Sequence, residues 1–210
     1  MKAIICNHIN YFLGHMPEGF NLRGASIGNI ILAGGYLNNN KNIDTVLYIF
    51  SKLVEVRGLV KPVITSPMHL VAQLQDGTEL VGQHKLSAKE SEPIKSPVKR
   101  LFLTRTNGDN GNNDTINNNK THDNDETPDV SGNDTVEIER DVRSLIEKAE
   151  LIVYPMGSFY SSVISNLLPA GVGEAVAFNH CPKIYVPNTA ADPEQLGMDL
   201  YDSVKTLIHY

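Results

Sequence analysis

Leu-Ile-Val-Tyr-Pro-Met-Gly-Ser-Phe-Tyr-Ser-Ser (residues 151–162) joins a continuously apolar run to a polar turn. Four consecutive apolar residues, 151–154, are typical of a strand in a parallel sheet that is covered on both faces. A helix is predicted at 160–168, directly after Gly157 and Ser158. The stretch therefore predicts a strand–turn–helix unit, which is the repeating element of α/β folds.

Similar units extend from this stretch in both directions. Downstream, the patterns predict a helix at 173–178, a buried strand at 183–186 and a helix at 199–208, and upstream they predict a helix at 136–149. Nearer the N-terminus, helices are predicted at 7–13, 27–37 and 43–56 and strands at 59–64 and 98–103, and a hairpin is predicted at 70–81 around Asp76-Gly77. The predicted fold is α/β: a doubly wound, mainly parallel, Rossmann-like sheet with a small antiparallel hairpin.

Residues 106–135 form a low-complexity, Asn- and Asp-rich segment. Its six Asp and one Glu against one Lys account for the whole formal net charge of −6. We predict a disordered insertion, because the segment has almost no apolar side chains to bury. The other residues of 1–210 are predicted to form one domain. That body has no basic excess, which argues against a nucleic acid partner.

The two cysteines, Cys6 and Cys181, are far apart in sequence and form no disulfide framework. No run reaches the ~20 apolar residues that a membrane span requires. The N-terminal apolar run 3–6 is interrupted too early for a secretory signal. We therefore predict a cytoplasmic protein without a membrane partner.

The turn after the 151–154 strand is a candidate phosphate site. In open α/β sheets, ligands bind beyond the carboxyl ends of the strands, where helix N-termini offer free N–H groups. Gly157 would let a phosphate approach the backbone, and Ser158 and Ser161 would add hydroxyl groups. Alternatively, Ser158 simply caps the helix.

Two further segments could contribute to the same site. Gly28 and Asn29 are poor helix formers at the start of an otherwise apolar helix, and Ser26 precedes them as a natural N-cap. A ligand contact would explain them, as would capping together with tight helix packing at Gly28. Asn188 follows the 183–186 strand and should reach the same sheet edge as Gly157, although an ordinary turn would also explain it.

Several known site patterns are absent. The sequence contains no Gly-x-Ser-x-Gly elbow, no Walker A motif and no Gly-x-Gly-x-x-Gly motif. The stretches Cys6-Asn7-His8 and His180-Cys181 lack the paired spacing of a zinc site.

The blocks of sequence together resemble the CofD-like family, which includes 2-phospho-L-lactate transferases and YvcK-type gluconeogenesis factors. The resemblance rests on residues 23–34, 57–63, 74–78, 81–84, 96–103, 152–162 and 181–188. It implies a doubly wound fold that binds a nucleotide or a nucleotide-activated small molecule. By motif match it places Ser26, Gly28, Asn29, Gly157, Ser158, Ser161 and Asn188 at the ligand.

The sequence also departs from the family pattern. A Gly-Gly-Gly-Thr-Gly-like phosphate loop and an Asp-Asp-Gly-Gly-like acidic loop do not appear, and family members continue beyond the position of Tyr210. The chain therefore looks like the middle of the fold. Mg²⁺ is implied as a cofactor by the resemblance alone, and Asp192 and Glu194 are weak candidates for its ligands. An exposed sheet edge would allow a homo-oligomer.

Three functional hypotheses follow. The first is a transferase resembling 2-phospho-L-lactate transferase, which moves a phospholactyl group from a guanosine-diphosphate-activated donor to a deazaflavin alcohol. The second is a non-catalytic regulator that binds a nucleotide sugar, which the missing acidic loop favours. The third is an inactive fragment. No catalytic residue is assigned from the sequence.

Overall fold

Helices make up most of the first 62 residues. The structure, a computed structural model, describes residues 2–23, 25–87, 92–105 and 134–210 and divides into two compact units, Met1–Pro62 and Val63–Tyr210. The predicted insertion at 106–135 lies outside the described residues except for its last two positions. The single domain expected over 1–210 stays a prediction.

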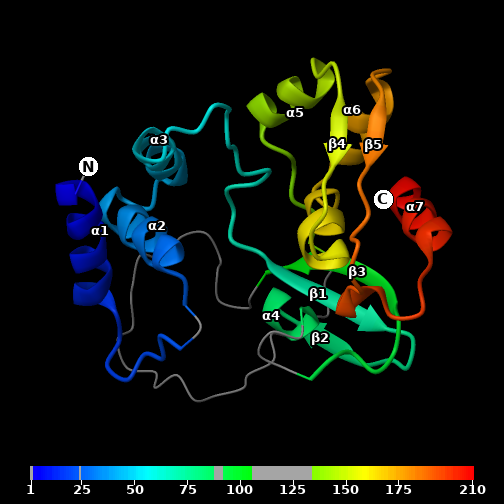
Figure 1. Cartoon of the computed structure of the whole chain (residues 1–210), viewed down its shortest axis with the longest axis horizontal. Coiled ribbons are helices and arrows are strands. Elements are labelled where there is room, and N and C mark those ends of the chain that lie inside the picture. Colours follow the sequence, from blue (N-terminus) through cyan, green and yellow to red (C-terminus); the bar gives the residue numbers. More distant parts are fainter. Residues whose placement is uncertain (1, 24, 88–91, 106–133) are drawn as a thin grey trace. The chain divides into compact units, whose positions relative to one another are not determined.

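The first unit contains α1 (Lys2–His15), α2 (Ile27–Asn38) and α3 (Ile43–Leu53), coloured blue to cyan in Figure 1. All three helices were predicted, although α1 is longer at both ends. Asn42 caps α3 by accepting a hydrogen bond from the backbone N–H of Thr45 at 2.9 Å. The predicted strand at 59–64 is wrong, because these residues are irregular and Leu59 and Val60 are exposed.

The second unit contains a three-stranded antiparallel sheet in the order β2-β1-β3. Its strands are β1 (His69–Leu74), β2 (Glu79–Val81) and β3 (Val98–Thr104). The predicted hairpin is confirmed: Gly77 adopts a φ of 89°, and the Asp76 side chain accepts a hydrogen bond from Thr78 N at 2.9 Å. Glycine adopts this left-handed conformation without a steric penalty.

A parallel pair forms the second sheet. Strands β4 (Ile152–Tyr154) and β5 (Lys183–Tyr185) pair in the register Ile152–Lys183 and Tyr154–Tyr185. The α/β class is thus confirmed, and both predicted strands are present. The prediction that they are covered on both faces is wrong, because Val153 and Ile184 are 45% and 47% exposed. Within the described residues, however, this is the only pair of parallel strands, and the larger sheet is antiparallel. The doubly wound arrangement stays a prediction.

Helices α4 (Gln83–Leu86), α5 (Arg140–Glu147), α6 (Val172–Phe178) and α7 (Leu200–His209) complete this unit. Helix α5 begins four residues later than predicted, because the Glu137 backbone forms a parallel bridge with Ala170 and keeps residues 136–139 extended. Val136 and Ile138 are nevertheless buried.

The helix predicted at 160–168 is replaced by a π-helical turn, η1 (Phe159–Val163), and a short 3₁₀ turn, η2 (Ile164–Asn166). Side chains compete for its carbonyl groups: Ser165 Oγ donates to Ser161 O at 2.8 Å, and Asn166 Nδ2 donates to Ser162 O at 2.6 Å. Such local bonds disfavour a regular helix. In Figure 1 these turns follow β4 and lie between the two sheets, where Phe159, Tyr160 and Ile164 share one core with β1 and β3.

Candidate ligand site at the ends of the parallel strands

The carboxyl ends of β4 and β5 lead into two loops that meet. Gly157 N donates a hydrogen bond to Asn188 Oδ1 at 3.1 Å, and Asn188 Nδ2 donates to Gly157 O at 2.8 Å. The side-chain amide of Asn188 therefore pairs with the backbone of the other loop as a neighbouring strand would. This confirms the expectation that Asn188 reaches the sheet edge occupied by Gly157.

The backbone N–H groups of Phe159, Tyr160 and Ser161 already have acceptors within the chain. Phe159 N donates to Asp192 Oδ2 at 2.7 Å. Tyr160 N and Ser161 N both donate to Glu194 Oε2 at 2.8 Å. Two carboxylates thus occupy the part of the turn where the sequence predicted a phosphate. Carboxylate and phosphate groups are both anions, and both accept hydrogen bonds from backbone N–H groups.

Glu194 is the most buried of these acceptors, with 1% of its surface exposed. Its Oε1 also accepts a hydrogen bond from Ser161 Oγ at 2.5 Å. Burial raises the pKa of Glu194 above its ordinary value, and the hydrogen bonds from Ser161 and Tyr160 oppose that shift without cancelling it. Protonation of this carboxyl group is therefore easier in the folded chain than in the unfolded chain.

The two predicted serines of the turn have different environments. Ser161 is buried, and its hydroxyl is engaged by Glu194. Ser158 precedes the η1 turn, is half-buried and makes no capping hydrogen bond with its side chain. The alternative interpretation, in which the Ser158 side chain caps the helix, is therefore wrong. Of the two hydroxyl groups, the Ser158 hydroxyl is the better placed to contact a ligand.

The other three predicted site residues lie at the start of α2, in the first unit. Ser26 is the N-cap, and its Oγ accepts a hydrogen bond from Asn29 N at 3.0 Å, as the capping interpretation predicted. The Asn29 side chain is exposed. The prediction of tight packing at Gly28 is wrong. A Cβ atom placed there would have Ser26 Oγ as its nearest neighbour, at 3.8 Å.

Asp192 and Glu194 do not provide a free pair of metal ligands. Asp192 Oδ1 accepts from Glu194 N at 3.0 Å, and its Oδ2 also receives the Asn188 amide at 3.3 Å. Among the described residues there is no cluster of three or more histidine, cysteine, aspartate or glutamate side chains. The role of these two carboxylates as internal acceptors was missed from the sequence, although their position just beyond Asn188 signalled that they reach the same edge.

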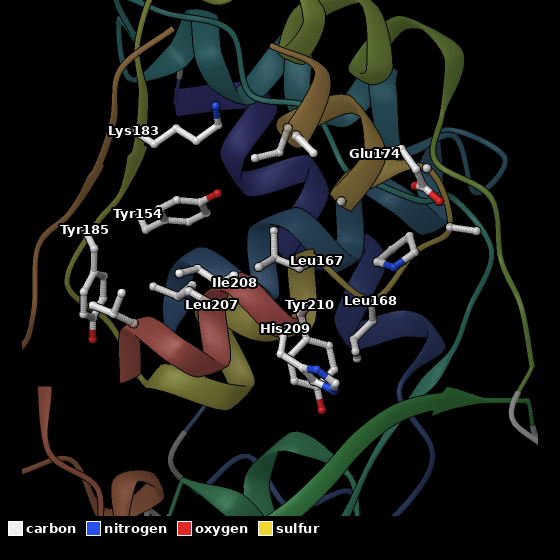
Figure 2. A pocket seen from close by; sticks show the side chains of 17 residues that line it. Tyr154, Leu167, Leu168, Glu174, Lys183, Tyr185, Leu207, Ile208, His209 and Tyr210 are labelled. Carbon is white, nitrogen blue, oxygen red and sulfur yellow. The ribbon is translucent and has the colours of Figure 1, made fainter. Parts of the chain in front are cut away.

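Two hollows lie near these elements in the second unit. The smaller has a volume of about 290 Å³ and is lined in part by Asn188, Asp192 and Asp199. The larger, about 790 Å³, lies among β4, β5, α6 and α7 and is shown in Figure 2. Apolar side chains dominate its lining, and Tyr154 and Lys183 supply polar groups from the strands. None of the seven predicted site residues lines this larger cavity.

The helices in the described part of the chain are all too short or too polar to cross a bilayer.

The chain is similar to several known proteins. The sequence profile described as 2-phospho-L-lactate transferase CofD matches residues 8–210. The gluconeogenesis factor of Bacillus subtilis is 28% identical over 93% of this chain and 51% of its own length. That of Halalkalibacterium halodurans is 28% identical over 90% of this chain and 51% of its length.

The fold is also similar to a solved structure. The crystal structure of a UPF0052 family member from Bacillus halodurans has a TM-score of 0.65 at 25% identity and covers 95% of this chain and 54% of that chain. The chain therefore spans about half the length of these relatives. Because the family profile covers nearly all of the sequence, the chain belongs to the CofD family.

Proposed function

We propose that the chain is a nucleotide-sugar-binding regulator of the gluconeogenesis-factor type rather than a catalyst. The observation that carries this proposal is the 28% identity, over about nine-tenths of the chain, to proteins named gluconeogenesis factor. The engagement of Asp192 and Glu194 by backbone N–H groups supports it, because these carboxylates are then not open to a metal ion that would assist group transfer.

The proposed ligand site is formed by Gly157, Ser158 and Asn188 at the strand ends. Gly157 has no side chain to obstruct a phosphate, and the Ser158 hydroxyl would donate to a phosphate oxygen. Ser161 is proposed as a buried support for the turn. A ligand contact of Ser26, Gly28 and Asn29, in the first unit, stays a prediction. The proposal includes the doubly wound arrangement of the sheet, a cytoplasmic location and a homo-oligomer.

A second candidate is phospholactyl transfer, which the description of the matching family profile favours. Mg²⁺ would then serve as a cofactor, with its ligands not yet assigned. Incubation of the purified chain with a guanosine-diphosphate-activated phospholactate, a deazaflavin alcohol and Mg²⁺ distinguishes the two candidates. Formation of the phospholactyl product would replace the regulator proposal with the transferase one.

The direct test of the regulator proposal is thermal unfolding with a panel of nucleotides. UDP-glucose is compared with UDP, GDP and ATP, each added in large excess. A ligand at about 100 times its Kd stabilises the folded protein by about 2.7 kcal/mol, which is a readily measured shift in Tm. A shift with UDP-glucose but not with ATP is expected. Absence of a shift with every uridine compound would exclude the proposal.

Gly157→Ala tests the location of the phosphate. A Cβ atom at Gly157 would meet only Ser162 Cβ, at 3.6 Å, so the unliganded fold should accept it. The added methyl group would block close approach of a phosphate, and we expect a loss of affinity for UDP-glucose of at least about tenfold, measured by calorimetry. Gly58→Ala is the matched control, since a Cβ atom there meets nothing within 4 Å. Equal affinities of the two variants would remove Gly157 from the site.

A further inference from the structure

Side chains of the segment from Asn188 to Glu194 accept hydrogen bonds from successive backbone N–H groups of the turn after β4. Asn188 accepts from Gly157 N, Asp192 from Phe159 N, and Glu194 from the next two backbone N–H groups. The donors and acceptors are 31 to 34 residues apart in sequence. A distant segment therefore supports the shape of the turn, in addition to the local hydrogen bonds of Ser165 and Asn166.

The sequence of the turn explains why it needs this support. Residues 159–163 form a π-helical turn, which is a rare conformation without strong local stabilisation. The side chains of Ser165 and Asn166 compete for its carbonyl groups. Without the carboxylates, several N–H groups in a buried region would lack acceptors, and the turn would relax toward another conformation.

We infer that Asp192 and Glu194 are positioning residues, which hold the turn at Gly157 and Ser158 in the conformation that binds the ligand phosphate. This inference rests on the proposed function. Each carboxylate acts through the backbone of the turn and does not touch the ligand. A preformed turn binds more tightly because less conformational freedom is lost when the ligand arrives.

The same contacts restrict where the phosphate can bind. The N–H groups of Phe159, Tyr160 and Ser161 are directed at carboxylate oxygens, so a phosphate would reach them only by displacing these anions. The Gly157 N–H is likewise donated to Asn188 Oδ1, so the donor proposed for the phosphate is the Ser158 hydroxyl, beside a Gly157 that has no side chain to obstruct it. The carboxylates thus set both the shape and the limits of the site.

The test compares variants that keep, shorten or remove the hydrogen-bond acceptor at position 194 or 192. Glu194→Gln keeps an oxygen at the same distance from the backbone and should retain affinity for UDP-glucose within about threefold. Glu194→Asp withdraws the carboxylate by one methylene group and should weaken binding at least about tenfold. Asp192→Ala tests the same role through a half-buried side chain and should act in the same direction as Glu194→Asp.

Val142→Ala is the control for simple loss of stability. Val142 is buried on α5 in the apolar core that also holds Phe159 and Tyr160, but its side chain makes none of the hydrogen bonds of the turn, so its truncation should lower Tm with little change in affinity. Amide hydrogen exchange provides a readout that does not depend on the ligand: Tyr160 and Ser161 should exchange faster in Glu194→Asp, but not selectively in Val142→Ala.

The outcomes separate the two claims. If the wild-type chain binds UDP-glucose and Glu194→Asp and Asp192→Ala bind equally well, the positioning role is refuted while the proposed function stands. If Val142→Ala loses as much affinity as they do, the effect is general destabilisation and the inference also fails. If the wild-type chain binds none of the nucleotides, the proposed function fails, and the positioning role fails with it.

Discussion

Gly34→Ala is expected to disrupt the pairing of α1 and α2 and to lower the stability of the first unit by about 3 kcal/mol. A Cβ atom at Gly34 would overlap the backbone carbonyl of His8 on the facing helix. Backbone atoms cannot rotate aside as a flexible side chain can, so the helices must separate. The adjacent Gly35 is similarly confined, since its Cβ atom would lie 2.8 Å from the His8 ring.

Gly28→Ala is the matched control, because it makes the same substitution in the same helix where there is space. Alanine is the better helix former by up to about 1 kcal/mol, so this variant should be neutral or slightly more stable. Gly34→Ala should therefore lower the free energy of unfolding and Gly28→Ala should not, as measured by chemical denaturation with circular dichroism. Equal stability would contradict the close approach of the helices.

Glu194→Ala is expected to destabilise the second unit by about 3–5 kcal/mol. The substitution leaves the N–H groups of Tyr160 and Ser161 and the Ser161 hydroxyl without their acceptor. Unpaired donors in a buried region cost more than the net value of the hydrogen bonds they lose. Glu194→Gln retains an acceptor and should stay within about 1 kcal/mol of the wild type. A similar loss in both variants would show that the charge, rather than the acceptor, is required.

The pH dependence of Glu194 follows from its raised pKa. Burial raises the folded-state pKa above the unfolded value, so folding favours the protonated group. The stability this shift contributes is present in full below the unfolded pKa and is lost as the pH rises through the folded pKa. Between about pH 7 and about pH 4, the wild type should therefore gain stability relative to Glu194→Gln. A constant difference across this range would contradict the shift.

Much of the local structure could be predicted because its causes are local. The strands at 152–154 and 183–185 follow from continuous apolar runs, and the hairpin follows from Asp76-Gly77. The N-cap at Ser26 was similarly recognisable, since its hydroxyl bonds a residue only three positions away. In each case the residues that determine the structure lie within a few positions of one another.

The predictions that failed depended on distant contacts. The regular helix predicted at 160–168 gave way to a π-helical turn whose N–H groups bind carboxylates some 30 residues downstream. Tight packing occurs at Gly34 and Gly35 and not at Gly28, because the facing helix α1 passes closest there. The stretch 59–64 contains Lys61 and Pro62 and, within the described residues, belongs to no sheet.

By itself, then, the sequence determined the α/β class, the order of most elements, the resemblance to the CofD family and the meeting of Gly157 with Asn188 at one sheet edge. Only the tertiary structure decided what faces the turn beyond that edge. Backbone N–H groups bind whichever acceptor the fold brings within about 3 Å. The sequence of the turn therefore does not distinguish a turn that binds a phosphate from one that binds a carboxylate of a distant loop. In this chain those acceptors are Asp192 and Glu194.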